Sequence, residues 1–243
     1  MPNRPKLPCR VDSLQWAESG TALAAETGLV HCAHIPPQAT AAAPAPLVLM
    51  LHGWAGNEAA MWIFKQTVPP GVAIVTPRAP VDLQNGGFAW FSYGNYHQFE
   101  PERGALAAAL DQLAHFLHAL PRFYPVDPTR TLLMGFSQGA ITLNAFIFSN
   151  PDDAIGAASL AGAMPPVYGS QPQANLLAGL PVFIAHGSRD EVIPVAEARK
   201  TRDVYTAFGA DVTYGEYPAA HKMHVQAMKD MQRWLARLFP NVR

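Results

Sequence analysis

The sequence predicts an α/β fold: a mostly parallel, doubly wound sheet with helices on both of its faces. From residue 47 onward, short apolar runs alternate with segments whose apolar residues recur at helical spacing. The run at 47–51 is continuously apolar, which is typical of a parallel strand covered on both sides, while residues 212–217 alternate as a last strand. Apolar residues make up 49% of the 243 positions and charged residues 14%, which suits one large core. We therefore expect a single domain over residues 1–243, with right-handed crossovers between its strands.

The predicted domain has two parts. Residues 1–46 are expected to form two edge strands, at 11–18 and 29–35, followed by an Ala/Pro-rich connector. Residues 47–239 are expected to form the core. Its strands are predicted at 47–51, 72–76, 132–134, 157–160, 182–185 and 212–217, and its helices from Pro101, after residue 139, over 195–208 and through the last apolar stripe to Leu238.

The charge pattern excludes several kinds of partner. The net charge is −1 and there is no basic run, so neither a nucleic acid nor an anionic membrane would be attracted electrostatically. No apolar stretch approaches the roughly 18 residues of a membrane span. The N-terminus is basic and proline-rich but lacks the apolar run of a signal peptide, so we expect a cytoplasmic protein. Cys9 and Cys32 have no metal-ligand or redox spacing; we expect thiols, and a disulfide between them stays open.

A candidate nucleophile lies where an apolar strand passes into a helix. Gly135, Ser137 and Gly139 form G-x-S-x-G in this strand–turn–helix context. A serine on so sharp a turn has a strained backbone, and a side chain on either glycine would collide with the strand or the helix. The alternative is a glycine turn whose serine only caps the helix.

A candidate acid and a candidate base follow at later strand ends. Asp190 lies in the loop after the strand at 182–185, with Glu191 as a rival carboxylate and helix capping as its alternative role. His221 lies on the loop before the last helix, whereas His224 already falls on the helix. We therefore expect His221 to take the proton of Ser137, and Asp190 to orient the imidazole.

Attack of the serine on a carbonyl group leaves a negative charge on the carbonyl oxygen. Two backbone N–H groups are expected to stabilise this oxyanion. One belongs to Gln138, directly after the serine, and the other to Trp54, in the glycine-containing turn after the strand at 47–51. The alternative for the second is a turn that only lets the strand leave the sheet. This chemistry needs no metal and no cofactor.

Five segments together resemble the phospholipase/carboxylesterase family of α/β-hydrolases, to which acyl-protein thioesterases are related. These segments are residues 51–53, 78–80, 135–140, 186–194 and 217–221, and the resemblance covers about residues 47–239. It implies a serine carboxylic-ester hydrolase with Ser137, Asp190 and His221 at the triad positions, and Trp54 and Gln138 at the oxyanion positions. Two departures are Trp54, where the family often has a smaller aliphatic residue, and Ala220, where glycine is usual.

The substrate is expected to be a small ester. Residues 81–100 are aromatic and glycine-punctuated without a strand or helix pattern, and we expect Trp90 and Phe91, with Trp62, to line an apolar pocket. The alternative is that these aromatic side chains only cover the end of the sheet. No large insertion separates the strands, so we expect no extensive lid and accessible short-to-medium acyl or aryl esters. An acyl thioesterase, a lysophospholipase and, more distantly, a non-catalytic ligand-binding relative stay open, as does the choice between monomer and homodimer.

Overall fold

The computed structural model describes residues 18–84, 86–95, 99–166, 175–240 and 242. In this part of the chain a seven-stranded sheet has the order β1-β3-β2-β8-β9-β10-β11, parallel except for the antiparallel β1. The strands are β1 (His31–His34), β2 (Ala45–Leu51), β3 (Ala73–Pro77), β8 (Val126–Phe136), β9 (Gly156–Leu160), β10 (Pro181–Gly187) and β11 (Asp211–Tyr217). The predicted α/β fold is therefore confirmed.

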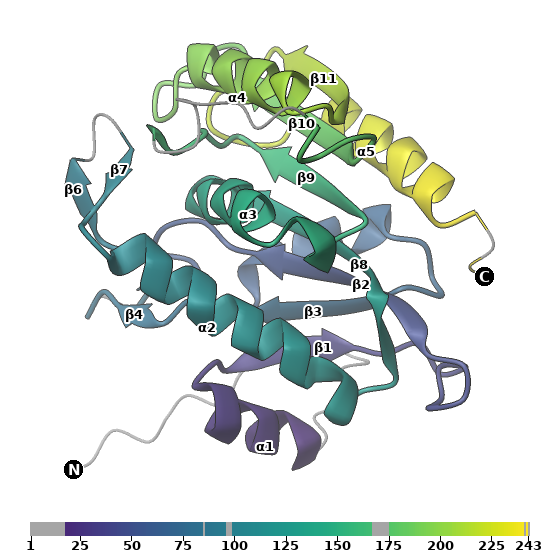
Figure 1. Ribbon diagram of the computed structural model, residues 1–243. Coiled ribbons are helices and arrows are strands. Elements are labelled where there is room, and N and C mark those ends of the chain that lie inside the picture. Colours follow the sequence, from purple (N-terminus) through teal and green to yellow (C-terminus); the bar gives the residue numbers. More distant parts are fainter. Residues whose placement is uncertain (1–17, 85, 96–98, 167–174, 241, 243) are drawn as a thin grey trace.

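Helices cover both faces of this sheet. The α-helices are α1 (Glu18–Thr27), α2 (Ala105–Ala119), α3 (Gln138–Ser149), α4 (Val195–Ala207) and α5 (Val225–Leu238), and the 3₁₀ helices are η1 (Ala60–Thr67), η3 (Leu120–Arg122) and η4 (Pro151–Asp153). Figure 1 shows α2 and α3 in front of the sheet. Helices α1 to α4 contribute to one apolar core, while η1 and α5 contribute to a second core on the opposite face.

The central strand β2 shows why its sequence is continuously apolar. Leu47, Leu49 and Leu51 belong to the core under α2 and α3, whereas Val48 and Met50 belong to the core under η1 and α5. Successive side chains of a strand point to opposite faces, so a strand buried on both faces favours apolar residues at every position. All seven residues of β2 are buried.

Two small hairpins lie beyond the ends to which the arrows of β2 and β3 point (Figure 1). They consist of β4 (Val81–Asp82) with β5 (Phe88–Ala89), and of β6 (Tyr93–Asn95) with β7 (Glu100–Pro101). These ends are the carboxyl ends of the parallel strands, where α/β folds place their binding sites. In the described residues no helical lid domain is inserted between the sheet and its covering helices.

The N-terminal part differs from the predicted pair of edge strands. The strand expected at 29–35 is confirmed as β1, which pairs with β3. The strand expected at 11–18 lies outside the described residues except for Glu18, which begins helix α1. Alanine and glutamate have high helix propensity, and α1 buries Leu23 fully in the core that α2 shares. Gly28, with φ +76°, follows its last turn.

Helix α2 begins four residues later than the prediction from Pro101. Pro101 instead pairs with Tyr93 in the β6–β7 hairpin, and the N–H of Glu102 donates to the carbonyl oxygen of Ser92 at 2.7 Å. Gly104 then takes φ +78° before the helix starts at Ala105. The proline is therefore held by its hairpin, and the helix starts only after the glycine has turned the chain.

No helix among the described residues has the length and apolar character that crossing a membrane requires.

Candidate active site

Ser137 lies on a strained turn between β8 and α3. Its backbone has φ +55° and ψ −120°, a conformation rare outside glycine. The two flanking glycines make the turn possible: a Cβ on Gly135 would lie 2.4 Å from the carbonyl oxygen of Gly139, and a Cβ on Gly139 would lie 2.1 Å from that of Leu51. The N–H of Ser137 donates to the carbonyl oxygen of Leu160 on β9 at 2.9 Å, which ties the turn to the sheet.

The side chains of Ser137, His221 and Asp190 form one hydrogen-bonded chain. Nε2 of His221 lies 2.9 Å from Oγ of Ser137, and Nδ1 of His221 lies 2.7 Å from Oδ2 of Asp190. A carboxylate only accepts, so Nδ1 carries the proton and Nε2 is free to accept from the serine hydroxyl. The imidazole is 19% exposed, and its ring packs against Phe136 with the ring centroids 5.2 Å apart.

The Asp190 carboxylate is fully buried and held from three directions. Its Oδ1 accepts the N–H groups of Val192 and Ile193, each at 2.9 Å, while Oδ2 accepts from His221. A buried carboxylate stays charged only where hydrogen bonds replace its water, and these donors supply them. Strand β10 ends at Gly187, so the loop places the carboxylate at the carboxyl edge of the sheet.

His186 is a buried neighbour of the carboxylate that the sequence reasoning did not single out. Its Nε2 donates to the carbonyl oxygen of Ile193 at 2.8 Å and lies 3.4 Å from Oδ2 of Asp190. Its Nδ1 is buried and meets no hydrogen-bond partner in the described structure. Burial therefore lowers the pKa of His186, against the opposing effect of the Ile193 hydrogen bond and the Asp190 charge. Its position at the end of a strand, four residues before Asp190, was the available signal.

The two rival residues have other positions. His224 precedes α5 as its N-cap, where its Nδ1 accepts the N–H of Gln226 at 3.1 Å, and its ring stacks on Tyr217. Glu191 is exposed, although it follows Asp190 directly. The structure therefore brings His221 and Asp190, and neither rival, to Ser137.

The turn after β2 runs close to the serine. A Cβ on Gly53 would lie 3.2 Å from the Cβ of Ser137. The carbonyl oxygen of Gly53 accepts from Nδ1 of His52 at 2.8 Å and from the N–H of Gly56 at 3.0 Å. In the described part of the chain, no protein acceptor meets the N–H of Trp54 or the N–H of Gln138. Both groups therefore remain able to donate to a ligand beside Ser137.

Trp90 and Phe91 do not line an accessible pocket, contrary to the expectation from the sequence. Trp90 is 1% exposed and Phe91 is fully buried. Both residues lie next to the site, because the side chain of Gln138, the residue after Ser137, bonds to their backbone. Its Oε1 accepts the N–H of Trp90 at 2.9 Å, and its Nε2 donates to the carbonyl oxygen of Phe91 at 2.8 Å. The aromatic residue that stays exposed here is Trp54, at 44%, with its ring 5.6 Å from that of Tyr93.

Trp62 lies toward the amino ends of the parallel strands, whereas Ser137 lies at their carboxyl ends. It lines a surface pocket of about 760 Å³ together with His34, Val68 and Pro70. His34 pairs with Ile74 near the beginning of β3, so this pocket faces the amino ends of the parallel strands. The position gives no support to the expected contact between Trp62 and a substrate at Ser137.

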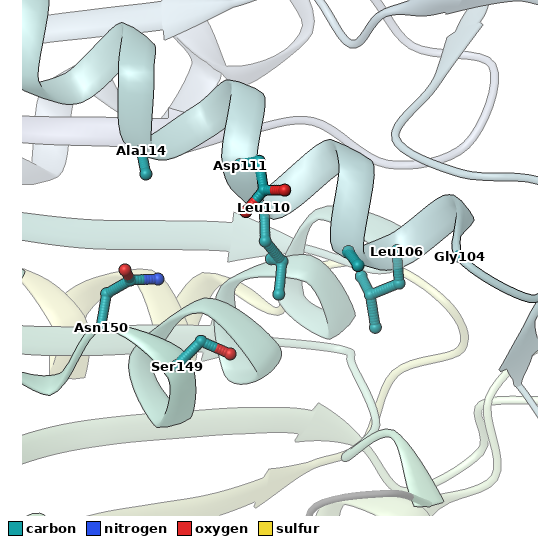
Figure 2. Close-up of a pocket in the computed structure, with 8 residues that line it drawn as sticks. Gly104, Leu106, Leu110, Asp111, Ala114, Ser149 and Asn150 are labelled. Carbon is teal, nitrogen blue, oxygen red and sulfur yellow. The ribbon is translucent and has the colours of Figure 1, made fainter.

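A further pocket of about 390 Å³ lies between α2 and the end of α3 (Figure 2). Leu106, Leu110 and Asp111 line one side of it, and Ser149 and Asn150 line the other. Ser137 and Ser149 lie at opposite ends of α3, which at 1.5 Å per residue separates them by about 18 Å. This pocket is therefore distinct from the site at Ser137.

The described residues contain no group of three or more His, Cys, Asp or Glu side chains arranged to hold a metal ion. Cys32 is buried on β1, and Cys9 lies outside the described residues. The absence of a cofactor and the state of the two cysteines stay predictions.

Comparisons with known proteins agree with this fold. The sequence model of the phospholipase/carboxylesterase family matches residues 32–239. Esterase YpfH of Escherichia coli is 27% identical over 172 residues, which cover 69% of this chain and 71% of that protein.

Among solved structures, a Bacillus cereus carboxylesterase has a TM-score of 0.80 at 22% identity, covering 92% of this chain and all of its own. Acyl-protein thioesterase 2 of Zea mays has a TM-score of 0.67 at 21% identity, covering 86% of this chain and 98% of its own. The family model matches residues 32–239, which is most of the chain. This match establishes that the chain belongs to the phospholipase/carboxylesterase family of α/β-hydrolases, a family of esterase-type hydrolases.

Proposed function

We propose that the protein is a serine carboxylic-ester hydrolase that works through an acyl-enzyme on Ser137. The observation that carries the proposal is the continuous chain from Oγ of Ser137 to Nε2 of His221 (2.9 Å) and from Nδ1 of His221 to Oδ2 of Asp190 (2.7 Å). These are hydrogen-bond distances for a nucleophile, a general base and the carboxylate that orients the base.

The first half of the reaction acylates the serine. His221 takes the hydroxyl proton of Ser137 while Oγ forms a bond to the carbonyl carbon of the ester. The negative charge that develops on the carbonyl oxygen is stabilised by the N–H groups of Trp54 and Gln138. The carbon–oxygen bond to the alcohol then breaks, and the alcohol leaves with the proton from His221.

The second half returns the enzyme to its starting state. Water, deprotonated by His221, attacks the acyl carbon, and the same two N–H groups stabilise the second oxyanion. The bond to Oγ breaks, Ser137 recovers its proton, and the carboxylic acid is released. Asp190 stabilises the imidazolium in both halves and does not itself take the proton.

Accessible esters with a short-to-medium acyl or aryl group suit the surface around the site. Trp54, whose N–H is one of the two proposed oxyanion donors, has an exposed apolar side chain (44%), and so does Val192 (43%), two residues after Asp190. The described residues provide no helical lid. A carboxyl ester could therefore reach Ser137 from solvent and place its apolar part against these side chains.

Labelling with a fluorophosphonate, followed by mapping of the modified peptide, tests the nucleophile. We expect the label on Ser137 alone, and we expect Ser137→Ala to lose both the label and ester hydrolysis by at least about 10⁴-fold, as triad nucleophiles do. The exposed Ser188 gives a matched control, because Ser188→Ala removes a neighbouring hydroxyl and should keep the activity. Labelling elsewhere, or an active Ser137→Ala protein, would refute the assignment.

The ratio of kcat/KM on matched acyl esters and acyl thioesters decides between ester and thioester hydrolysis. The similarity to a thioesterase structure keeps the second class in the comparison. We expect kcat/KM to be higher on a short-to-medium acyl ester than on the thioester of the same acyl group, and a higher value on the thioester would overturn this preference.

A further inference from the structure

The two N–H groups assigned to the oxyanion come from separate chain segments. Trp54 follows strand β2, and Gln138 follows strand β8. The two strands are neighbours, with Leu51 opposite Gly135. An oxyanion hole needs its donors fixed relative to each other before reaction, because reorganising them would cost part of the stabilisation they provide. The sheet fixes the two strands, but Trp54 lies three residues beyond the last residue of β2.

Trp90 makes hydrogen bonds to both segments. Its backbone N–H donates to Oε1 of Gln138 at 2.9 Å, and its indole Nε1–H donates to the carbonyl oxygen of His52 at 2.9 Å. The adjacent carbonyl of Phe91 accepts from Nε2 of Gln138 at 2.8 Å. Trp90 and the Gln138 side chain are both buried, so water cannot replace these bonds at low cost.

The bond to His52 acts close to the Trp54 donor. Nε2 of His52 accepts the N–H of Ala79 at 3.0 Å, so Nδ1 carries the proton and donates to the carbonyl oxygen of Gly53 at 2.8 Å. That carbonyl belongs to the same planar peptide group as the N–H of Trp54. Holding the oxygen therefore sets the direction in which the N–H points.

The bond to Gln138 acts in the same way on the second donor. The Gln138 side chain is anchored at both of its polar atoms, while its own backbone N–H is the proposed donor. The carbonyl of Ser137, in the same peptide group, accepts the N–H groups of Ala140 and Ile141 at 2.9 and 3.1 Å. The direction of this N–H is thus fixed by the first turn of α3 and by the anchored side chain together.

We propose that Trp90 is a positioning residue that fixes the position and direction of the two oxyanion donors relative to each other. It does so by connecting His52, next to one donor segment, with Gln138, which carries the other donor. We refer to Trp90, Phe91 and the Gln138 side chain as the brace. The inference rests on the proposed serine esterase function and explains why an aromatic side chain beside the site is buried. Trp90 needs no contact with the substrate for this role.

Steady-state kinetics on a p-nitrophenyl ester, with binding of a trifluoromethyl ketone that forms a tetrahedral oxyanion on Ser137, tests the proposal. Trp90→Phe keeps a buried aromatic ring and removes the indole N–H to His52 together with part of the ring volume. We expect its kcat to fall about tenfold or more with KM within about twofold, and the affinity for the ketone to fall in parallel. The pH dependence of kcat/KM should stay unchanged, because the contacts of His221 and Asp190 are untouched.

Phe116→Leu is the matched control. Phe116 is fully buried in the same apolar core but lies on α2, so its truncation should lower stability while leaving kcat and ketone affinity within about twofold. A wild-type enzyme that hydrolyses esters, paired with a Trp90→Phe protein that behaves like Phe116→Leu, would overturn the brace alone. A wild-type protein without hydrolysis or ketone binding would overturn the proposed function and the brace together.

Gln138→Met removes the other end of the brace and keeps the length of the side chain. We expect a similar loss of kcat, and in the double variant a loss clearly smaller than the product of the two single losses, because one break already separates the donors. Fully multiplicative losses would contradict a single connected brace. If Gln138→Met does not fold, Trp90→Phe against Phe116→Leu still decides the question.

Discussion

Asp190 uses its two carboxylate oxygens for different purposes. Oδ1 accepts two backbone N–H groups and fixes the carboxylate, whereas Oδ2 faces Nδ1 of His221. In Asp190→Asn the amide oxygen can still accept the backbone groups, so the amide nitrogen must face His221 and favour the wrong tautomer. We expect kcat for ester hydrolysis to fall by about 10⁴-fold, as in comparable triads, with little change in the midpoint of urea unfolding.

The neighbouring carboxylate provides the control for this prediction. Glu191 is exposed and follows Asp190 directly, so Glu191→Gln changes the net charge equally without touching His221. Its kcat should stay within about twofold of the wild type. Equal losses in the two variants would mean that the Asp190 effect is one of long-range charge and not of tautomer.

At the scale of elements, helix α3 lies directly against strand β2. Ten of its twelve residues are buried, and Gly139 in its first turn faces the carbonyl oxygen of Leu51. In Gly139→Ala the new Cβ would lie 2.1 Å from that oxygen, so the helix and the strand must separate. We expect a loss of about 3 kcal/mol or more in the free energy of unfolding, at the upper end for overpacked cores, measured by urea denaturation.

Gly94 offers the matching control in a hairpin. It is exposed, and a Cβ placed there would meet backbone atoms only at 3.4 Å or more, so Gly94→Ala should change the free energy of unfolding by less than about 0.5 kcal/mol. A Gly139→Ala protein as stable as Gly94→Ala would show that α3 can shift without cost, in spite of the close approach of Gly139 to Leu51.

At the scale of the whole molecule, three buried histidines make stability depend on pH. Burial lowers the pKa of His31, His52 and His186 from the usual 6.5. Well above pH 6.5 they are neutral in the folded and in the unfolded chain, so their effect on the free energy of unfolding no longer changes with pH. Below it the unfolded chain binds protons that the folded protein does not, so the free energy of unfolding falls as the pH is lowered.

We therefore expect stability to decrease from about pH 6.5 toward pH 5, with a slope of up to roughly 1.4 kcal/mol per pH unit for each histidine. His31 lies on β1, three strands away from β8 and the Ser137 turn in the sheet, and its Nε2 is 2.8 Å from the hydroxyl of Tyr124. His31→Gln should therefore make the slope shallower without altering kcat. Urea unfolding at several pH values measures both. A stability that does not change between pH 7 and pH 5 would contradict the prediction.

The architecture and the candidate chemistry could be predicted from the order of the amino acids. Short, largely apolar runs predicted β2, β3, β9 and β10, because the pattern of a strand buried on both faces depends only on that strand. The glycines on either side of Ser137 indicated the strained turn, because a local steric demand leaves a local mark. The order of Ser137, Asp190 and His221 along the chain named three side chains that the structure brings within hydrogen-bond distance.

The contacts of the aromatic residues and of the buried histidines, in contrast, depend on how distant parts of the chain pack together. Residues 81–100 have no periodic pattern, so the burial of Trp90 and Phe91 depends on what packs over them, and here that is the turn after β2 and the start of α3. The same is true of the two histidines. His52 accepts the N–H of Ala79, which is distant in the chain, and His186 donates to the carbonyl oxygen of Ile193, which lies beyond a turn. A side chain in an irregular loop takes its surroundings from the rest of the fold, and sequence spacing carries no record of them.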